Sequence, residues 1–276
     1  MSDFITSAEA ARIAGVGTTA IKRWADAGAL ECVRTPGGHR RFRRSDVERL
    51  AQNGRATAAP DETWTNWITL LAADGDIHVV QARLFEERAR RGSWHGVADV
   101  LGGLLEEIGR RWENGDLSVI DEHLASAALQ RALTAVMTAM PLPPGAPRCL
   151  LAAAEGEDHT LGLSLVELCL AEAGWRTEWA GSPTRATDIA DRLARGGIDL
   201  VAISAAASAT DRAALLREAN EVGVACRAAG VALALGGRGA WPDQPPYGVR
   251  FHALLPFFDY AVRERLALEQ RRRAPR

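Results

Sequence analysis

A histidine stands between two acids and a glycine in the stretch EGEDHTLG, residues 155–162. A neutral imidazole is a good metal ligand when its second nitrogen donates a hydrogen bond to a carboxylate, and Glu157 lies two residues before His159. Gly162 leaves room for a large group to approach the backbone. These residue types can form a metal site. Taken alone, however, they fit a structural loop histidine better, because few single histidines are ligands.

A local excess of positive charge lies near the N-terminus of a chain whose formal net charge is only -2. Residues 1–50 hold nine Lys and Arg against six Asp and Glu, and residues 34–44 carry five arginines and no acid. Such a cluster of basic residues is typical of a surface that binds nucleic acid, although a solvated basic loop has the same composition.

The first segment, about residues 1–50, has the pattern of two short helices joined by a glycine-containing turn. A hairpin-like wing is expected at RTPGGHRRF, residues 34–42. In a helix-turn-helix the second helix lies in the major groove, so hydroxyl and cationic side chains near its start can reach DNA, while Ile21 and Trp24 pack inward. The candidate DNA-binding residues on this helix and the wing are Thr18, Thr19, Lys22, Arg23, Arg34, His39, Arg40, Arg41 and Arg43. The alternative is a small helical domain with a basic loop.

The second segment, about residues 61–140, has helical periodicity nearly throughout. Residues 79–92, 94–115 and 119–140 each place apolar side chains three and four positions apart. Because the breaks between them are short, the helices should be antiparallel neighbours in a four-helix bundle. The proline-rich stretch PLPPGAP, residues 141–147, ends the helical pattern.

The third segment, from Arg148, alternates short apolar runs with amphipathic helices. The candidate strands are CLLAAA, RTEWAG, DLVAISA, VALALGG and, last, VRFHALL. This alternation predicts a parallel sheet with helices on both faces, a Rossmann-like or flavodoxin-like α/β domain. Ligands of such sheets bind at the carboxyl ends of the strands, where His159 and Gly162 should lie.

The N-terminal segment resembles a known family over nearly all of residues 4–50. The phrase TPGGHRRF, together with AEAARIAGVGTTAIKRWADAGAL, closely resembles the winged-helix DNA-binding domain of MerR-type transcriptional regulators. The resemblance implies binding to operator DNA.

The loop EDHTLG resembles the DxHxxG loop of cobalamin (vitamin B12)-binding domains, with Glu157 in place of the usual Asp. That family has a serine further along, and Ser204 stands at the expected spacing in VAISAAAS; Gly236 and Gly237 end the strand LALGG. The resemblance implies that His159 is the lower axial ligand of cobalt. It also implies that Ser204 contacts the displaced nucleotide tail, for which the glycines, including Gly162, make space.

The helical segment resembles the cap of light-dependent B12-binding regulators of the CarH and LitR type. Trp112 is followed after nine residues by Glu122 and His123. The resemblance implies that Trp112 packs against the 5′-deoxyadenosyl group of adenosylcobalamin, which Glu122 and His123 hydrogen-bond or orient. Without this context, the pattern is that of a helix with one core tryptophan and an exposed Glu-His pair.

One position departs from this family. In its well-studied light sensors, a histidine directly after the tryptophan captures cobalt once light has expelled the adenosyl group, and here that position is Glu113. His95, upstream in the helical segment, is a possible substitute. The departure places a bis-histidine photoproduct in doubt.

Composition agrees with an intracellular protein. Hydrophobic content is 47% with 25% charged residues, and no apolar run reaches the length of a membrane span. The four cysteines are far apart and form no CxxC pair, which suits a reducing compartment better than a disulfide scaffold or a zinc site. We expect a cytoplasmic location, no membrane partner, and no autonomous enzymatic activity.

These observations predict a multidomain chain. The expected divisions are a MerR-type winged helix-turn-helix (1–52), a linker (53–62), a four-helix bundle capping the upper cobalamin face (63–141) and an α/β cobalamin-binding domain (148–268). The hypothesis is a cobalamin-dependent, light-responsive repressor that uses adenosylcobalamin and binds operator DNA as a homo-oligomer, a dimer or tetramer.

Two alternatives remain at this point. The first is a cobalamin-binding regulator that does not respond to light, which Glu113 keeps open. The second is a corrinoid methyl-carrier protein, which also pairs a helical bundle with a cobalamin domain but has no use for a winged helix.

Overall fold

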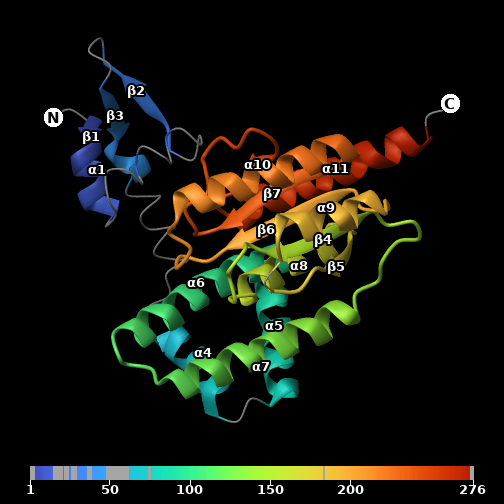
Figure 1. Ribbon diagram of the computed structural model, residues 1–276. Helices are drawn as coiled ribbons and strands as arrows, with labels where there is room; N and C mark the ends of the chain where they lie inside the picture. The colour runs from blue at the N-terminus through green and yellow to red at the C-terminus, as the bar shows by residue number, and fades with distance from the viewer. Residues whose placement is uncertain are drawn as a thin grey trace. The chain divides into compact units, whose positions relative to one another are not determined.

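The computed structural model describes residues 4–14, 21, 25, 30–35, 39–47, 62–73, 76–182 and 184–273 (Figure 1). The chain divides into two compact units, Met1–Thr65 and Asn66–Arg276. Each unit has a hydrophobic core of its own.

The N-terminal unit contains a small antiparallel sheet with strand order β1-β3-β2. Its elements are β1 (Phe4–Thr6), α1 (Ser7–Ala14), β2 (Cys32–Arg34) and β3 (Arg40–Arg43). Helix α1 begins with a reciprocal cap, because the Glu9 N–H donates to Thr6 Oγ1 and the Thr6 N–H donates to the Glu9 carboxylate. Ile21 and Phe42 are fully buried. The β2–β3 hairpin confirms the predicted wing.

Four helices make up the middle of the chain, as the periodicity predicted. They are α4 (Glu62–Ala73), α5 (Ile77–Arg91), α6 (Trp94–Glu113) and α7 (Val119–Thr138). The last three helices each have an N-cap residue whose side chain accepts a hydrogen bond from a backbone N–H of the first turn. These N-cap residues are Asp76, Ser93 and Ser118. The connections between these three helices are short. Helix α5 packs on both α6 and α7.

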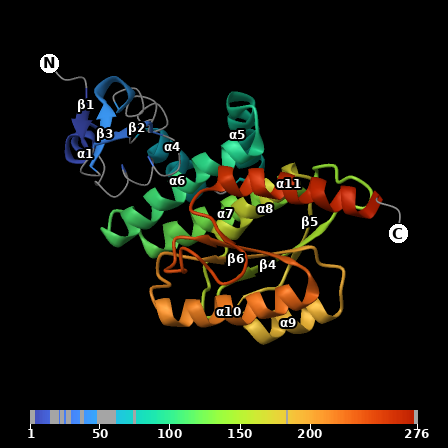
Figure 2. The same cartoon turned by 90° about the horizontal axis from the view of Figure 1, so that it is seen from above.

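The C-terminal part is a five-stranded parallel sheet with strand order β5-β4-β6-β7-β8. Its elements are β4 (Arg148–Ala153), α8 (Leu161–Glu172), β5 (Arg176–Trp179), α9 (Ala186–Ala194), β6 (Leu200–Ala205), α10 (Arg212–Ala229), β7 (Ala232–Gly237), β8 (Val249–Arg250) and α11 (Leu254–Arg273). This is the flavodoxin-like order, and it confirms the predicted fold class. Helices α9 and α10 cover one face, and α8 and α11 cover the other (Figure 2).

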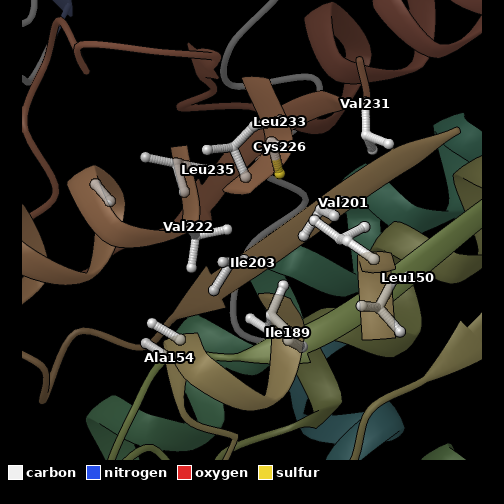
Figure 3. Packing of buried hydrophobic residues seen from close by; sticks show 14 of the residues in the cluster. Leu150, Ala154, Ile189, Val201, Ile203, Val222, Cys226, Val231, Leu233 and Leu235 are labelled. Carbon is white, nitrogen blue, oxygen red and sulfur yellow. The ribbon is translucent and has the colours of Figure 1, made fainter. Parts of the chain in front are cut away.

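The core of the α/β part lies between the sheet and helices α9 and α10. Figure 3 shows Val201 and Ile203 of β6 and Leu233 of β7 packed toward Ile189 of α9 and Val222 of α10. The central strands β4 and β6 are buried along nearly their whole length, which is why they read as continuous apolar runs. On the opposite face α8 packs on α6, α7 and α11, so the helical layer is continuous with the α/β part.

The structure corrects one expectation near the C-terminus. The last strand is only Val249–Arg250, because the chain turns and begins α11 at Leu254, so His252 lies outside the sheet. Helix α11 extends to Arg273, and Arg272 donates to both carboxylate oxygens of Asp199. All four cysteines are free, as expected. Within the described residues, no helix is long and apolar enough to cross a membrane.

Candidate cobalamin and DNA sites

The candidate site lies where the strand order reverses. Strands β4 and β6 are neighbours in the sheet, but the chain leaves β4 toward β5 on one side and leaves β6 toward β7 on the other. In open parallel sheets the loops at such a reversal separate and form the ligand crevice. His159 is in the loop after β4, and Ser204 is near the end of β6. The two predicted residues therefore belong to the two strands after which such a crevice is expected.

The His159 side chain is 73% exposed and is held by a buried carboxylate. Its Nδ1 lies 2.5 Å from Glu157 Oε1, and its backbone N–H donates to the same oxygen at 2.9 Å. Glu157 is only 4% exposed, and its Oε2 accepts the Ala206 N–H at 2.9 Å. Because Nδ1 faces the carboxylate, Nε2 is the nitrogen that can serve as a ligand.

The Glu157 carboxyl remains ionised despite its burial. Burial by itself raises its pKa, but the hydrogen bonds from His159 and Ala206 outweigh that effect, and the pKa lies below its ordinary value. An ionised carboxylate next to Nδ1 favours the imidazole tautomer with its proton on Nδ1. That tautomer leaves Nε2 with a lone pair for a metal.

Ser204 and three glycines form a cradle beside His159. Ser204 is 8% exposed, and an added Cβ at Gly162 would lie 3.9 Å from its Oγ. A Cβ at Gly237 would lie 2.8 Å from the same oxygen. Gly236 has room for a side-chain atom, since its added Cβ would meet only Ile203 O within 4 Å, at an ordinary contact distance of 3.9 Å. The hydroxyl is thus flanked by backbone without side chains.

These residues fit the cobalt of a cobalamin. Within the described residues, no three His, Cys, Asp or Glu side chains converge to hold a bare metal ion. His159 is a single, exposed, carboxylate-supported imidazole, which suits a metal whose other positions are filled by its own macrocycle. The cradle of Gly162, Ser204 and Gly236 offers space and one hydroxyl for a polar extension of the ligand.

The three predicted upper-face residues lie around the connection between α6 and α7. Trp112, in the last turn of α6, is 49% exposed. Glu122, in the first turn of α7, accepts a hydrogen bond from Ser126 Oγ at 2.7 Å, and the exposed His123 has its Nε2 3.6 Å from Glu122 Oε2. The exposed indole does not fit the alternative of a core tryptophan. Helices α6 and α7 both pack on α8, the helix that follows His159.

The structure does not support His95 as a substitute cobalt ligand. It stands at the start of α6, and its Nδ1 lies 2.8 Å from Oε2 of Glu172, at the end of α8. Its ring also stacks on Phe258 of α11, with centroids 4.1 Å apart. Because His159 precedes the start of α8, His95 lies at the opposite end of that helix, about 18 Å away for twelve residues at 1.5 Å each.

The described part of the candidate DNA-binding surface is the wing. Arg34 of β2 pairs with Arg40 of β3, and Arg41 pairs with Val33. The exposed Arg43 lies over the Phe4 ring, and the His39 N–H donates to Thr35 Oγ1. The candidates of the second helix, Thr18, Thr19, Lys22 and Arg23, lie outside the described residues.

Two contacts of the loop were not anticipated from the sequence. Ser182 Oγ donates to the backbone carbonyl of Glu157 at 2.5 Å, and the Ala206 N–H binds the Glu157 carboxylate. Ser182 follows β5 and Ala206 follows β6, so only the sheet order could have placed them beside the loop after β4.

Comparison with known families agrees with this architecture. Residues 4–55 match a family described as a helix-turn-helix domain, and residues 66–137 and 147–246 match two families described as B12 binding domains. A helix-turn-helix followed by two B12-binding segments defines the class of cobalamin-dependent, DNA-binding regulators.

Relatives place the chain within that class. The HTH-type transcriptional repressor CarH of Myxococcus xanthus is 30% identical over an alignment of 234 positions, which covers 72% of this chain and 78% of that protein. The chain belongs to the family of this repressor. The repressor CarA of the same species is 37% identical over 101 residues, 37% of this chain and 33% of that protein. The predicted family is thereby confirmed.

A solved structure gives independent support for the fold. The monomethylamine corrinoid protein of Methanosarcina barkeri superposes with a TM-score of 0.54 at 14% identity, covering 72% of this chain and 96% of that protein. At this identity the likeness concerns the fold alone.

Proposed function

We propose that the protein is a light-responsive transcriptional repressor that binds adenosylcobalamin. The observation that carries the proposal is the supported His159 imidazole beside a serine-glycine cradle, in a chain that begins with a helix-turn-helix. The family of DNA-binding repressors to which the chain belongs supports a regulatory rather than an enzymatic role.

In this proposal His159 would hold cobalt through Nε2. Ser204, with Gly162, Gly236 and Gly237, would receive the nucleotide tail. Trp112 would contact the adenosyl group, and Glu122 and His123 would orient it. When bound, the cofactor supplies a cobalt–carbon bond that light can break. The half-exposed indole of Trp112 is available for a ligand, since its helix α6 is already packed on α5 and α8.

The second element of the proposal is DNA binding by the N-terminal unit. We infer that residues 1–52 read operator DNA, that residues 63–141 cap the cofactor and that residues 148–268 hold it. One small winged helix makes few contacts, so operator affinity depends on joining several copies in an oligomer. Because Trp112 would contact the adenosyl group, its packing would depend on that group, and a looser oligomer would release DNA without a change in any DNA-contacting residue.

A second candidate is a cobalamin-binding regulator with another signal. Glu113 favours it, because this exposed residue occupies the position of the histidine found in light sensors of the family, and His95 is bonded to Glu172 at the end of α8. Without a second imidazole, the illuminated state here would lack a histidine on the upper face.

Gel filtration with an in-line absorption spectrum tests the proposal. The full chain is loaded with adenosylcobalamin in darkness, and half of the sample is illuminated with green light before the run. A larger, cobalamin-containing dark species that breaks down after illumination supports the proposal. An unchanged size supports the second candidate, and absence of co-elution refutes cobalamin binding.

The variant Trp112→Ala tests the upper-face assignment. Because the indole would contact the adenosyl group, its removal should prevent dark assembly while leaving weak DNA binding by single copies. Dark oligomers of normal size in this variant would contradict the role of Trp112.

A further inference from the structure

A buried carboxyl on α10 contacts the start of the loop that carries His159. Glu218 is 5% exposed, and both of its carboxylate oxygens lie 3.2 Å from the backbone nitrogen of Glu155. Helix α10 covers the face of the sheet opposite α8 (Figure 2). The contact therefore reaches the loop from the side that carries no other predicted site residue.

The contact with Glu218 lies at the point where the loop leaves strand β4. The Ala154 N–H donates to Ser204 O and is the last hydrogen bond between the β4 and β6 segments. The next backbone donor, the N–H of Glu155, is the one that Glu218 receives. Two residues later the Glu157 carboxylate binds Ala206. The loop is thus anchored at its start by α10 and in its middle by the loop after β6.

Burial makes Glu218 an unusual acceptor. Burial raises its pKa to about 7, the Glu155 N–H opposes the rise, and the carboxylates of Glu155 and Glu221 add to it. Within the described residues no Lys or Arg pairs with it. The strand β7, on which α10 packs, holds no titratable side chain.

Helix α9 also packs on α10, and two of its three charged groups are engaged elsewhere. Asp188 binds Arg185, and Arg192 binds Glu178 of β5. Asp191 is exposed. The Glu155 N–H is accordingly the polar contact that the structure gives to the Glu218 side chain.

We propose that Glu218 is a positioning residue for the cobalt-ligating loop, fixing the point at which the chain leaves β4 and hence the place of His159. This inference rests on the proposed binding of cobalamin. Glu218 touches neither the cofactor nor His159, and it acts through the backbone of Glu155.

Three variants of the full chain test this role. Glu218→Met keeps the side-chain volume but removes the acceptor, so the Glu155 N–H loses the hydrogen bond to Glu218. Glu218→Gln keeps an amide oxygen for that N–H and removes only the charge. Glu221→Gln is the matched control, since Glu221 lies one turn further along α10 and is exposed. Circular dichroism establishes that each variant is folded.

Two readouts separate positioning from general stability. The first is cobalamin affinity, which should fall roughly 10-fold in Glu218→Met, because binding must then order the loop without this hydrogen bond, whose loss corresponds to about one tenfold step. The second is the electron paramagnetic resonance spectrum of cob(II)alamin bound to ¹⁵N-labelled protein. A protein imidazole splits each cobalt line into a doublet, whereas the cofactor's own base gives a triplet. Glu218→Met should weaken the doublet, and Glu218→Gln should restore it.

The outcomes distinguish this inference from the proposed function. If the wild type gives the doublet and Glu218→Met keeps both the doublet and the affinity, the positioning role is refuted and cobalamin binding stands. If the wild type binds no cobalamin, both fail. Amide hydrogen exchange at Glu155 without cofactor adds an independent check, because only a true anchor gives protection that Glu218→Met abolishes.

Discussion

Alanine substitutions at the glycines near Ser204 should distinguish a glycine that the fold requires from glycines that leave space for the ligand. Gly237 has φ +79°, and an added Cβ would lie 2.2 Å from Ala205 O. Gly236 and Gly162 have ordinary backbone, and their added Cβ atoms meet nothing closer than 3.9 Å. We therefore expect Gly237→Ala to destabilise the fold, and Gly236→Ala and Gly162→Ala to fold normally but bind cobalamin poorly.

The size of the folding effect follows from two contributions. Left-handed backbone costs a residue with a Cβ about 1–2 kcal/mol. The contact with Ala205 O forces β6 or β7 to shift, which adds roughly 1–3 kcal/mol as in other overpacked sites. The sum for Gly237→Ala is about 2–5 kcal/mol. Gly230→Ala is the control, because Gly230 has φ +65° but open space, so only the first contribution applies.

Urea unfolding of the full chain, followed by circular dichroism, measures these differences as shifts of the midpoint. Equal midpoints for Gly237→Ala and Gly230→Ala would refute the argument from the Ala205 contact. Wild-type cobalamin affinity in both Gly236→Ala and Gly162→Ala would show that the cradle does not receive the ligand.

Three further predictions concern carboxyl groups. Neighbouring arginines hold the pKa of Glu107 at about 2 instead of 4.5, so its stabilising effect is present above about pH 4.5 and is lost as pH falls toward 2. The melting temperature of Glu107→Gln should therefore fall less steeply than that of the wild type as pH falls from about 4.5 to about 2. Glu172 accepts the N–H groups of Trp94 and His95, so Glu172→Leu should lower the unfolding free energy by about 1–3 kcal/mol in urea. The pKa of Glu218 is raised to about 7, so its stabilising effect is complete below pH 4.5 and is lost as pH rises through 7. The melting temperature of Glu218→Gln should not show this decrease between about pH 4.5 and about pH 7.

Much of the fold could be predicted from sequence because its signals are local. The buried strands β4 and β6 are continuous apolar runs, and α6 and α7 carry both helical periodicity and serine caps. Prediction was wrong at VRFHALL, where an apolar run resembled a strand although only Val249 and Arg250 pair with β7. The pairing depends on the neighbouring strand, which a local pattern does not contain.

The candidate site was predictable only in part. His159 and Glu157 are close in sequence, so their mutual contact could be expected, and Ser204 followed from a resemblance in spacing. Glu218 could not be found in this way, because it lies 63 residues from Glu155 and is an ordinary acid on an amphipathic helix. Its burial is a consequence of how α10 packs on the sheet.

The glutamate at position 157 illustrates how one substitution can bind two loops. Where the family motif has Asp, Glu157 uses Oε1 for His159 and Oε2 for the N–H of Ala206, after β6. A single side chain thereby connects the two loops that separate at the reversal of strand order. The carboxylate of this longer side chain is buried, its pKa lies below the ordinary value, and its Oε1 lies 2.5 Å from His159 Nδ1. The added methylene therefore leaves the imidazole supported and extends that support to the far side of the crevice.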